Sequence, residues 1–149
     1  MTLVMKRIQR LREEEKGITL IELLAVIVII GVIAAIAVPI ITGLLNDTRA
    51  NARTATANQI MEAAKLRSIA QQNGVIQGTH TLADLQAENY MQTGTTDPKT
   101  DSPLAGSTSV NLDNLSGTGT VVTLVVQGGD TVSYTAAELR AGKGGNAGK

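Results

Sequence analysis

The chain lacks several residue types on which whole classes of function depend. It has no cysteine, tryptophan or phenylalanine, and only one histidine and two tyrosines among 149 residues. Without cysteine, neither a disulfide nor a thiolate metal site is available. Tyr90 and Tyr134 are too few to build a stacked aromatic path for electron conduction. His80 has no cysteine or carboxylate pair beside it in the sequence, so we interpret it as a solvated loop residue.

Motifs that carry enzymatic chemistry are also missing. The sequence contains no phosphate-binding glycine loop, no nucleophile–base–acid set and no cluster of metal ligands. We therefore expect no enzymatic activity and no cofactor. Asp97 and Asp101 stand on either side of Pro98 and could offer oxygens to a calcium ion. Two carboxylates do not make an EF-hand pattern, however, and turn chemistry explains the same residues.

Charge is balanced overall but unevenly distributed. Residues 1–16 hold five basic and three acidic residues, and the positive-inside rule then places the N-terminus in the cytoplasm and the soluble part outside. After Gly74 the chain has four basic against seven acidic residues. A domain that grips phosphates should be basic, so we expect no direct contact with nucleic acid.

What the sequence has instead is a long apolar run from Ile18 to Leu45, in which only Thr19, Glu22 and Thr42 are polar. About 20 apolar residues suffice to cross a bilayer. A carboxylate in hydrocarbon costs at least about 2.5 kcal/mol, so Glu22 needs a partner. A free α-amino group at Ile18 of a neighbouring, staggered helix would supply one, because charge-assisted hydrogen bonds are strong in low dielectric.

The stretch Gly17-Ile-Thr-Leu-Ile-Glu22 and the apolar run as far as Pro39 resemble the N-terminus of type IV prepilins. That family includes pilins and the pseudopilins of type II secretion and competence systems. The resemblance implies that 1–17 is a leader, that a prepilin peptidase cuts between Gly17 and Ile18, and that the new amine of Ile18 is methylated. The family usually has phenylalanine at the position of Ile18. The missing disulfide loop makes the rest of the chain more like the subunits of Gram-positive organisms.

The same resemblance implies a structural subunit of a helical filament made of copies of this chain. The prepilin would lie in the cell membrane as a single-pass protein in contact with lipid, and would reach the cell surface through a membrane assembly platform with minor pilins. The residues do not distinguish a pilus from a competence or secretion pseudopilus. Two other interpretations stay open: a secretory signal cut after Ala37, where Ala35-Ile-Ala37 fits the cleavage pattern, and a single-pass surface protein that binds a partner through its β-domain without polymerising.

Gly31 and Pro39 interrupt the apolar run eight residues apart. Proline removes a backbone donor and its ring clashes with the preceding turn. We therefore expect the helix to bend or unwind at least cost between these two residues.

The expected fold is α+β, with a long N-terminal α-helix packed on a small antiparallel β-sheet. A transmembrane half, 18–45, continues into an amphipathic half, 46–74, which stops at Asn73-Gly74. We expect 75–141 to form a small α+β head and 142–149 a flexible tail. The helical face toward the sheet is predicted to consist of Ala50, Ala57, Ile60, Met61 and Ala64, widened by Leu66 and Ile69.

Local signals place the smaller elements of the head. Thr81-Leu-Ala-Asp84 and Thr135-Ala-Ala-Glu138 are capping-box patterns that predict two short helices. Residues 120–127 and 131–135 predict a β-hairpin, and 107–112 a third strand. So small a sheet needs a cover on one face, and the apolar stripe of the 46–73 helix can supply it.

Overall fold

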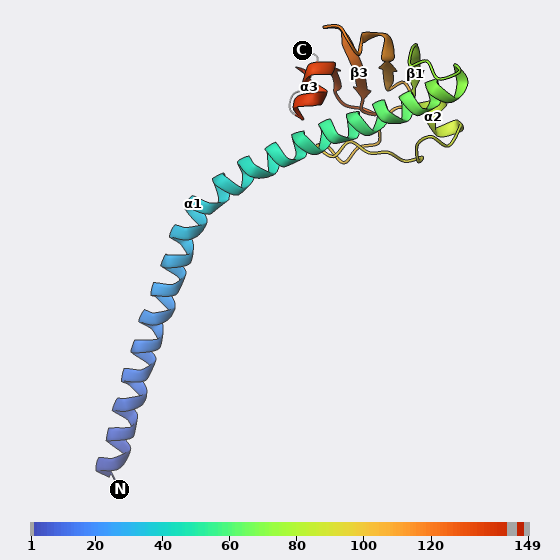
Figure 1. Ribbon diagram of the computed structural model, residues 1–149. Helices are drawn as coiled ribbons and strands as arrows, with labels where there is room; N and C mark the ends of the chain where they lie inside the picture. The colour runs from blue at the N-terminus through green and yellow to red at the C-terminus, as the bar shows by residue number, and fades with distance from the viewer. Residues whose placement is uncertain (1, 143–145, 148–149) are drawn as a thin grey trace. The chain divides into compact units, whose positions relative to one another are not determined.

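The computed structural model describes residues 2–142 and 146–147, and for 11–18 and 146–147 it describes the backbone alone. The chain divides into two compact units, Met1–Leu44 and Leu45–Lys149. One helix, α1 (Thr2–Gln71), supplies all of the described first unit and the first element of the second (Figure 1). The α+β class, with a long N-terminal helix and a small antiparallel sheet, is confirmed.

The helix α1 begins earlier than the sequence suggested. Its backbone is helical from Thr2, so the residues interpreted as a leader are part of the same helix as the apolar run. The stretch from Thr2 to Lys16 contains neither glycine nor proline, the two residues that most disfavour a helix. A leader and a helical conformation are therefore compatible.

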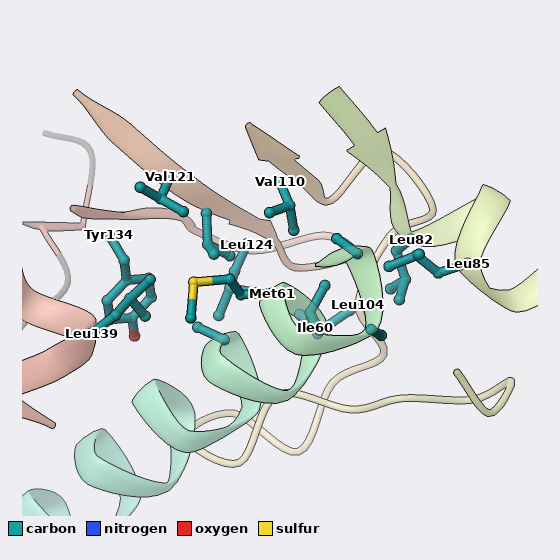
Figure 2. Close-up of a cluster of buried hydrophobic side chains, with 14 of the residues drawn as sticks. Ile60, Met61, Leu82, Leu85, Leu104, Val110, Val121, Leu124, Tyr134 and Leu139 are labelled. Atoms are coloured by element: carbon teal, nitrogen blue, oxygen red, sulfur yellow. The ribbon is translucent and has the colours of Figure 1, made fainter. Parts of the chain in front are cut away.

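The second unit is a meander of strands covered on one face by the C-terminal part of α1 (Figures 1 and 2). Neighbouring strands in the order β1-β2-β3-β4-β5 are antiparallel. The strands are β1 (Thr79–Thr81), β2 (Ser109–Asn111), β3 (Thr120–Val125), β4 (Thr131–Thr135) and β5 (Asn146–Ala147). The predicted hairpin and third strand are confirmed as β3, β4 and β2. Neither β1 nor β5 was predicted.

Three short helices complete the unit: α2 (Leu82–Ala87), the 3₁₀ turn η1 (Leu112–Asn114) and α3 (Ala136–Ala141). Both predicted capping boxes are present. Thr81 accepts a hydrogen bond from the Asp84 amide at the start of α2, and Thr135 accepts one from the Glu138 amide at the start of α3. The acidic side chain returns a bond to the cap backbone in each case, which satisfies amides that a helix start leaves unpaired.

A row of buried side chains runs across the sheet and faces α1. Register pairs His80 with Val110, Val110 with Val122, and Val122 with Tyr134. All four are at most 3% exposed. A register shift between Thr120 and Val122 allows Val121 to be buried as well, although strict alternation would turn it outward. This row fixes which sheet face α1 covers.

The predicted face of α1 that packs on the sheet is confirmed at its centre, but the two residues expected to widen it are wrong. Ala57, Ile60 and Ala64 are fully buried against the sheet, whereas Leu66 is 60% and Ile69 42% exposed. At about 100° per residue, Leu66 lies about 200° around the helix from Ala64 and points away from the sheet. The helix instead buries Arg53, Thr54 and Ser68, three polar residues that the hydrophobic pattern left out.

The chain reverses after α1 with the help of Ser68. Asn73 and Gly74 have φ angles of 53° and 90°, so the predicted helix stop at Asn73-Gly74 is confirmed. The Ser68 hydroxyl contacts the carbonyl oxygens of Val75 and Gln77 at 2.9 and 3.0 Å and accepts from the Gln77 amide at 3.0 Å. Of the predicted tail, 143–145 and 148–149 lie outside the described residues, while Asn146–Ala147 pairs with β4.

Candidate functional site

The large apolar side chains in the apolar part of α1 are exposed. Every large apolar side chain from Leu20 to Leu45 is between 51% and 69% exposed. Among the described residues, one helical stretch is long and apolar enough to cross a membrane, and its 18-residue window of mean hydropathy 3.2 has no buried residue. An uncovered surface of this kind must be met by lipid or by other protein.

Glu22 is the one charged residue between Thr19 and Leu45 and is exposed on the same helix. Gly17 and Ile18, the expected cleavage residues, have helical backbone, and their side chains are outside the described set. Four residues separate Ile18 from Glu22, so the two follow one another by about one turn of α1. The α-amino group that we assign as the partner of Glu22 exists only after cleavage, so their pairing remains a prediction.

Gly31 and Pro39 both lie inside α1, which is helical throughout this region. A Cβ added at Gly31 would meet nothing within 4 Å, so no neighbour in the chain requires glycine there. Pro39 has no amide hydrogen to give to the carbonyl of Ala35, one turn earlier. The Thr42 hydroxyl donates to the Val38 carbonyl at 2.8 Å, which satisfies this polar group within the apolar run. That the helix bends or unwinds between Gly31 and Pro39 remains a prediction.

Asp97, a calcium candidate from the sequence, is occupied by another partner. Its carboxylate is fully buried and forms a bidentate ion pair with Arg53, with Nε donating to Oδ1 at 2.5 Å and the second bond running from Nη2 to Oδ2. Thr100 donates its hydroxyl to Oδ2 at 2.7 Å. Asp101 is exposed, with φ of 56°. No group of three or more potential metal ligands occurs among the described residues, so we take the calcium interpretation no further.

The environment of Asp97 keeps it ionised. Burial by itself raises the pKa of its carboxyl group, but hydrogen bonds from Arg53 and Thr100 and the charge of Arg53 outweigh burial. The pKa of Asp97 therefore lies below its ordinary value. The bond to Asp97 also raises the pKa of Arg53. This pair ties α1 to the loop before β2 and gives both buried charges a partner.

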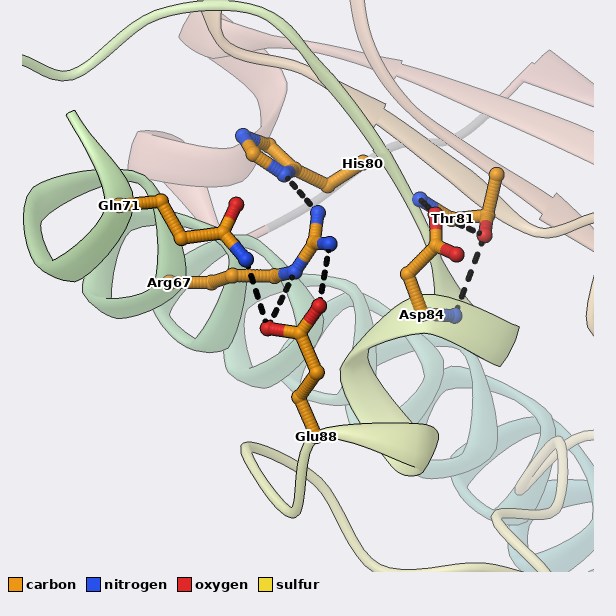
Figure 3. Close-up of polar contacts among 6 residues, drawn as sticks. All are labelled: Arg67, Gln71, His80, Thr81, Asp84 and Glu88. Atoms are coloured by element: carbon orange, nitrogen blue, oxygen red, sulfur yellow. Dashed lines mark hydrogen bonds and ion pairs between the residues drawn. The ribbon is translucent and has the colours of Figure 1, made fainter.

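A second polar cluster joins α1, β1 and α2 (Figure 3). Arg67 donates to both oxygens of Glu88, at 2.6 and 3.0 Å, and Gln71 donates to Glu88 at 2.8 Å. Another guanidinium nitrogen of Arg67 lies 2.7 Å from Nδ1 of His80. The interpretation of His80 as a solvated loop residue is wrong, because it lies on β1 and is 3% exposed.

The contacts of His80 define its tautomer. Arg67 can only donate, so Nδ1 of His80 accepts. The hydrogen is then on Nε2, which donates to the Gln77 carbonyl at 3.2 Å. Both ring nitrogens are used in holding the reversal after α1 to β1. His80 thus has a structural explanation, which the single histidine in a polar stretch gave no means of predicting.

An open groove of about 550 Å³ lies between α1 and residues 90–98. Its lining carries no charged side chain and includes Gln59, Tyr90, Met91 and several threonines. Among the described residues that line this groove, no set of reactive side chains comes together. The more distinctive feature of the chain is therefore the exposed apolar run with Glu22 in the first unit.

Comparison with known proteins bears on that unit. The family model for the prokaryotic N-terminal methylation motif matches residues 14–38. No curated protein and no solved structure matches the chain. The matched residues include Gly17, Ile18, Glu22 and Gly31, and Pro39 follows directly. A bare apolar helix leading into a small α+β head defines a pilin-like fold. The chain also carries the hallmark of the type IV prepilin and pseudopilin family.

Proposed function

We propose that this chain is a structural subunit of a type IV pilus-like filament. It is inserted in the membrane as a prepilin, cleaved after Gly17 by a prepilin peptidase, methylated on the amine of Ile18 and polymerised through α1. The observation that carries the proposal is the exposure of every large apolar side chain from Leu20 to Leu45 around a single carboxylate, Glu22. Lipid can cover this surface before assembly, and neighbouring α1 helices can cover it afterwards.

Glu22 is the residue that favours assembly over permanent anchoring. A carboxylate within an apolar helix is costly for a protein that remains in hydrocarbon. In a staggered bundle, the ammonium group of Ile18 from one subunit can meet the carboxylate of Glu22 from another. The low dielectric of the bundle strengthens that attraction. Methylation leaves the amine positively charged, so the pairing is retained.

The head then forms the outside of the filament. It shares a hydrophobic core with α1, and two ion pairs, Arg53–Asp97 and Arg67–Glu88, also bind it to α1. A head attached to α1 in this way is carried outward with each subunit as the helices bundle. The membrane assembly platform and minor pilins are the partners that this role requires. Neighbouring genes would distinguish a pilus from a competence or secretion pseudopilus.

The rival function is a single-pass surface protein that uses the same helix only as an anchor. Shearing filaments from cells and identifying the chain by mass spectrometry separates the two. A filament subunit is recovered in the sheared, membrane-free fraction as a polymer. A permanently anchored protein stays with the membranes, and finding all of the chain there overturns the proposal.

A further inference from the structure

The segment Thr2–Arg10 at the start of α1 has two different faces. Val4, Met5 and Ile8 are 63%, 68% and 53% exposed. At about 100° per residue, these three side chains lie within about 100° of one another on the helix. Leu3, which is 84% exposed, lies outside this face, at an angle between those of Arg10 and Arg7. An apolar stripe is thus open to the surroundings in a part of the chain that precedes the expected cleavage point.

The opposite side of this segment carries three basic side chains as well as Leu3. Lys6, Arg7 and Arg10 are exposed and lie about 100° to 160° around the helix from Ile8. No acidic residue occurs before Glu13. Apolar residues on one face and lysine and arginine on the other are typical of helices that lie in the membrane interface. Long basic side chains can extend from such a helix to phosphate groups.

A membrane surface is necessarily close to this segment if α1 is anchored as proposed. Nine residues separate Arg10 from Thr19, where the membrane-length stretch begins, which is about 13 Å along a helix. The positive-inside rule places this end at the cytoplasmic leaflet, whose lipids carry negative charge. Both the apolar stripe and the basic side chains therefore have a partner within reach.

We propose that residues 2–10 dock on the anionic headgroups of the cytoplasmic leaflet before cleavage. Val4, Met5 and Ile8 enter the boundary with the acyl chains, and Lys6, Arg7 and Arg10 bind lipid phosphates. The helix α1 is continuous through this region in the structure. To lie in the plane of the membrane, it must turn before Thr19, and Gly17 is the residue at which this turn costs least. Docking then holds the Gly17–Ile18 peptide bond at the membrane surface. This inference rests on the membrane anchorage proposed above.

The absence of cysteine allows a clean test on the full-length chain. Ile8→Cys, Gln9→Cys and Val28→Cys are each labelled with an environment-sensitive fluorophore and reconstituted into vesicles containing nitroxide-bearing lipid. The vesicles are phosphatidylcholine with or without phosphatidylglycerol. Both leaflets have the same composition, so the orientation of insertion does not matter. Residues 8 and 9 are adjacent in sequence but lie on different faces, which makes them a matched pair.

Docking predicts that lipid quenches the label at 8 more strongly than the label at 9, and that this difference needs phosphatidylglycerol. Changing Lys6, Arg7 and Arg10 together to glutamine should shift the equilibrium toward the undocked form by about 100-fold. High salt should act in the same direction. Equal quenching at 8 and 9 while the label at 28 is quenched overturns this inference alone, and would reassign the face to a protein. An unquenched label at 28 overturns the membrane anchorage as well.

Discussion

Arg53 and Asp97 form a buried ion pair between α1 and the loop that precedes β2, although 44 residues separate them in sequence. Their side chains are 5% and 0% exposed. Asp97 also accepts from Thr100, and its backbone bonds to Ser102 and Asp101. This one residue therefore organises a loop of otherwise irregular structure around the helix, through its carboxylate and its backbone.

Breaking this pair should destabilise the head strongly. Asp97→Ala leaves the Arg53 guanidinium buried without its carboxylate, which costs about 3 to 5 kcal/mol. Both tyrosines lie in the second unit, so near-ultraviolet circular dichroism of the full chain in mild detergent reports on the head during urea unfolding. The control is Glu62→Ala, which removes an exposed partner of Lys65 and should cost less than about 1 kcal/mol. Equal losses in the two variants would contradict this account.

Acid should unfold the head through carboxylates that are bound in the folded state. The pKa values of Asp97, Asp84 and Glu88 are lowered in the fold, from ordinary values of 3.8, 3.8 and 4.5. Near and below these values the unfolded chain binds more protons than the folded one, so stability falls as pH falls. We expect a flat stability profile above about pH 5 and a decline below it. Asp97→Asn should make the decline shallower, and an unchanged slope in urea titrations across this range would contradict the role of Asp97.

The sequence predicted those parts of the head that are determined by near neighbours. A capping box involves residues three apart, so Thr81 with Asp84 and Thr135 with Glu138 were sufficient to place α2 and α3. Strand β1 was missed because it has three residues and its last one, Thr81, is also the cap of α2. The hydrophobic pattern gave no sign of the burial of Arg53, since its partner Asp97 is distant in sequence.

The buried and exposed sides of α1 in the second unit can be compared with identical substitutions. Ile60 is fully buried against the sheet and Ile69 is 42% exposed. Ile60→Ala should cost about 2 to 5 kcal/mol, because it removes buried methyl groups and leaves a cavity. Ile69→Ala should change stability by less than about 1 kcal/mol, since a surface position loses little burial. The measurement is the urea unfolding midpoint of each variant. Similar midpoints would mean that α1 does not pack on the sheet through the face that contains Ile60.

The candidate site was predictable to a different degree. Gly17, Ile18, Glu22, Gly31 and Pro39 lie in order along one helix, so a local motif was sufficient to propose them, and their roles remain predictions. The partner of Glu22 could not be established from the sequence of one chain, because in our proposal that partner belongs to another molecule. His80 could not be interpreted correctly either, since its burial depends on Arg67 reaching it across the chain reversal.

Processing should yield a chain that begins at Ile18 with one methyl group on its amine. Intact-mass measurement and N-terminal analysis of the protein from its native cells test both points. A start at Val38 would instead establish the secretory-signal interpretation. Gly17→Asp should leave the leader attached and abolish filaments, because the resemblance to prepilins implies that the peptidase requires the small residue before the cut. Gly31→Ala is a matched control, since a Cβ there meets nothing within 4 Å, and it should be cleaved normally.

The substitution Glu22→Val addresses assembly directly. The span becomes more apolar and Gly17 is untouched, so membrane insertion and cleavage should both proceed. An incoming subunit without the carboxylate, however, leaves a buried ammonium group unpaired, and breaking a buried pair costs about 3 to 5 kcal/mol. Each decade in an equilibrium constant corresponds to about 1.4 kcal/mol, so the loss per contact is on the order of 100-fold or more. Few filaments should form.

The measurement is a count of sheared filaments by electron microscopy, with immunoblots of the membrane fraction to establish that the variant is present and cleaved. Glu62→Val is the matched control, because it removes the same side chain from an exposed position in the second unit. That variant should assemble, since its carboxylate lies outside the apolar run through which we propose that the helices bundle. If Glu22→Val cells make filaments of ordinary length and number, pairing between Glu22 and the Ile18 amine does not drive assembly, and Glu22 acts at most in positioning the helix in the membrane.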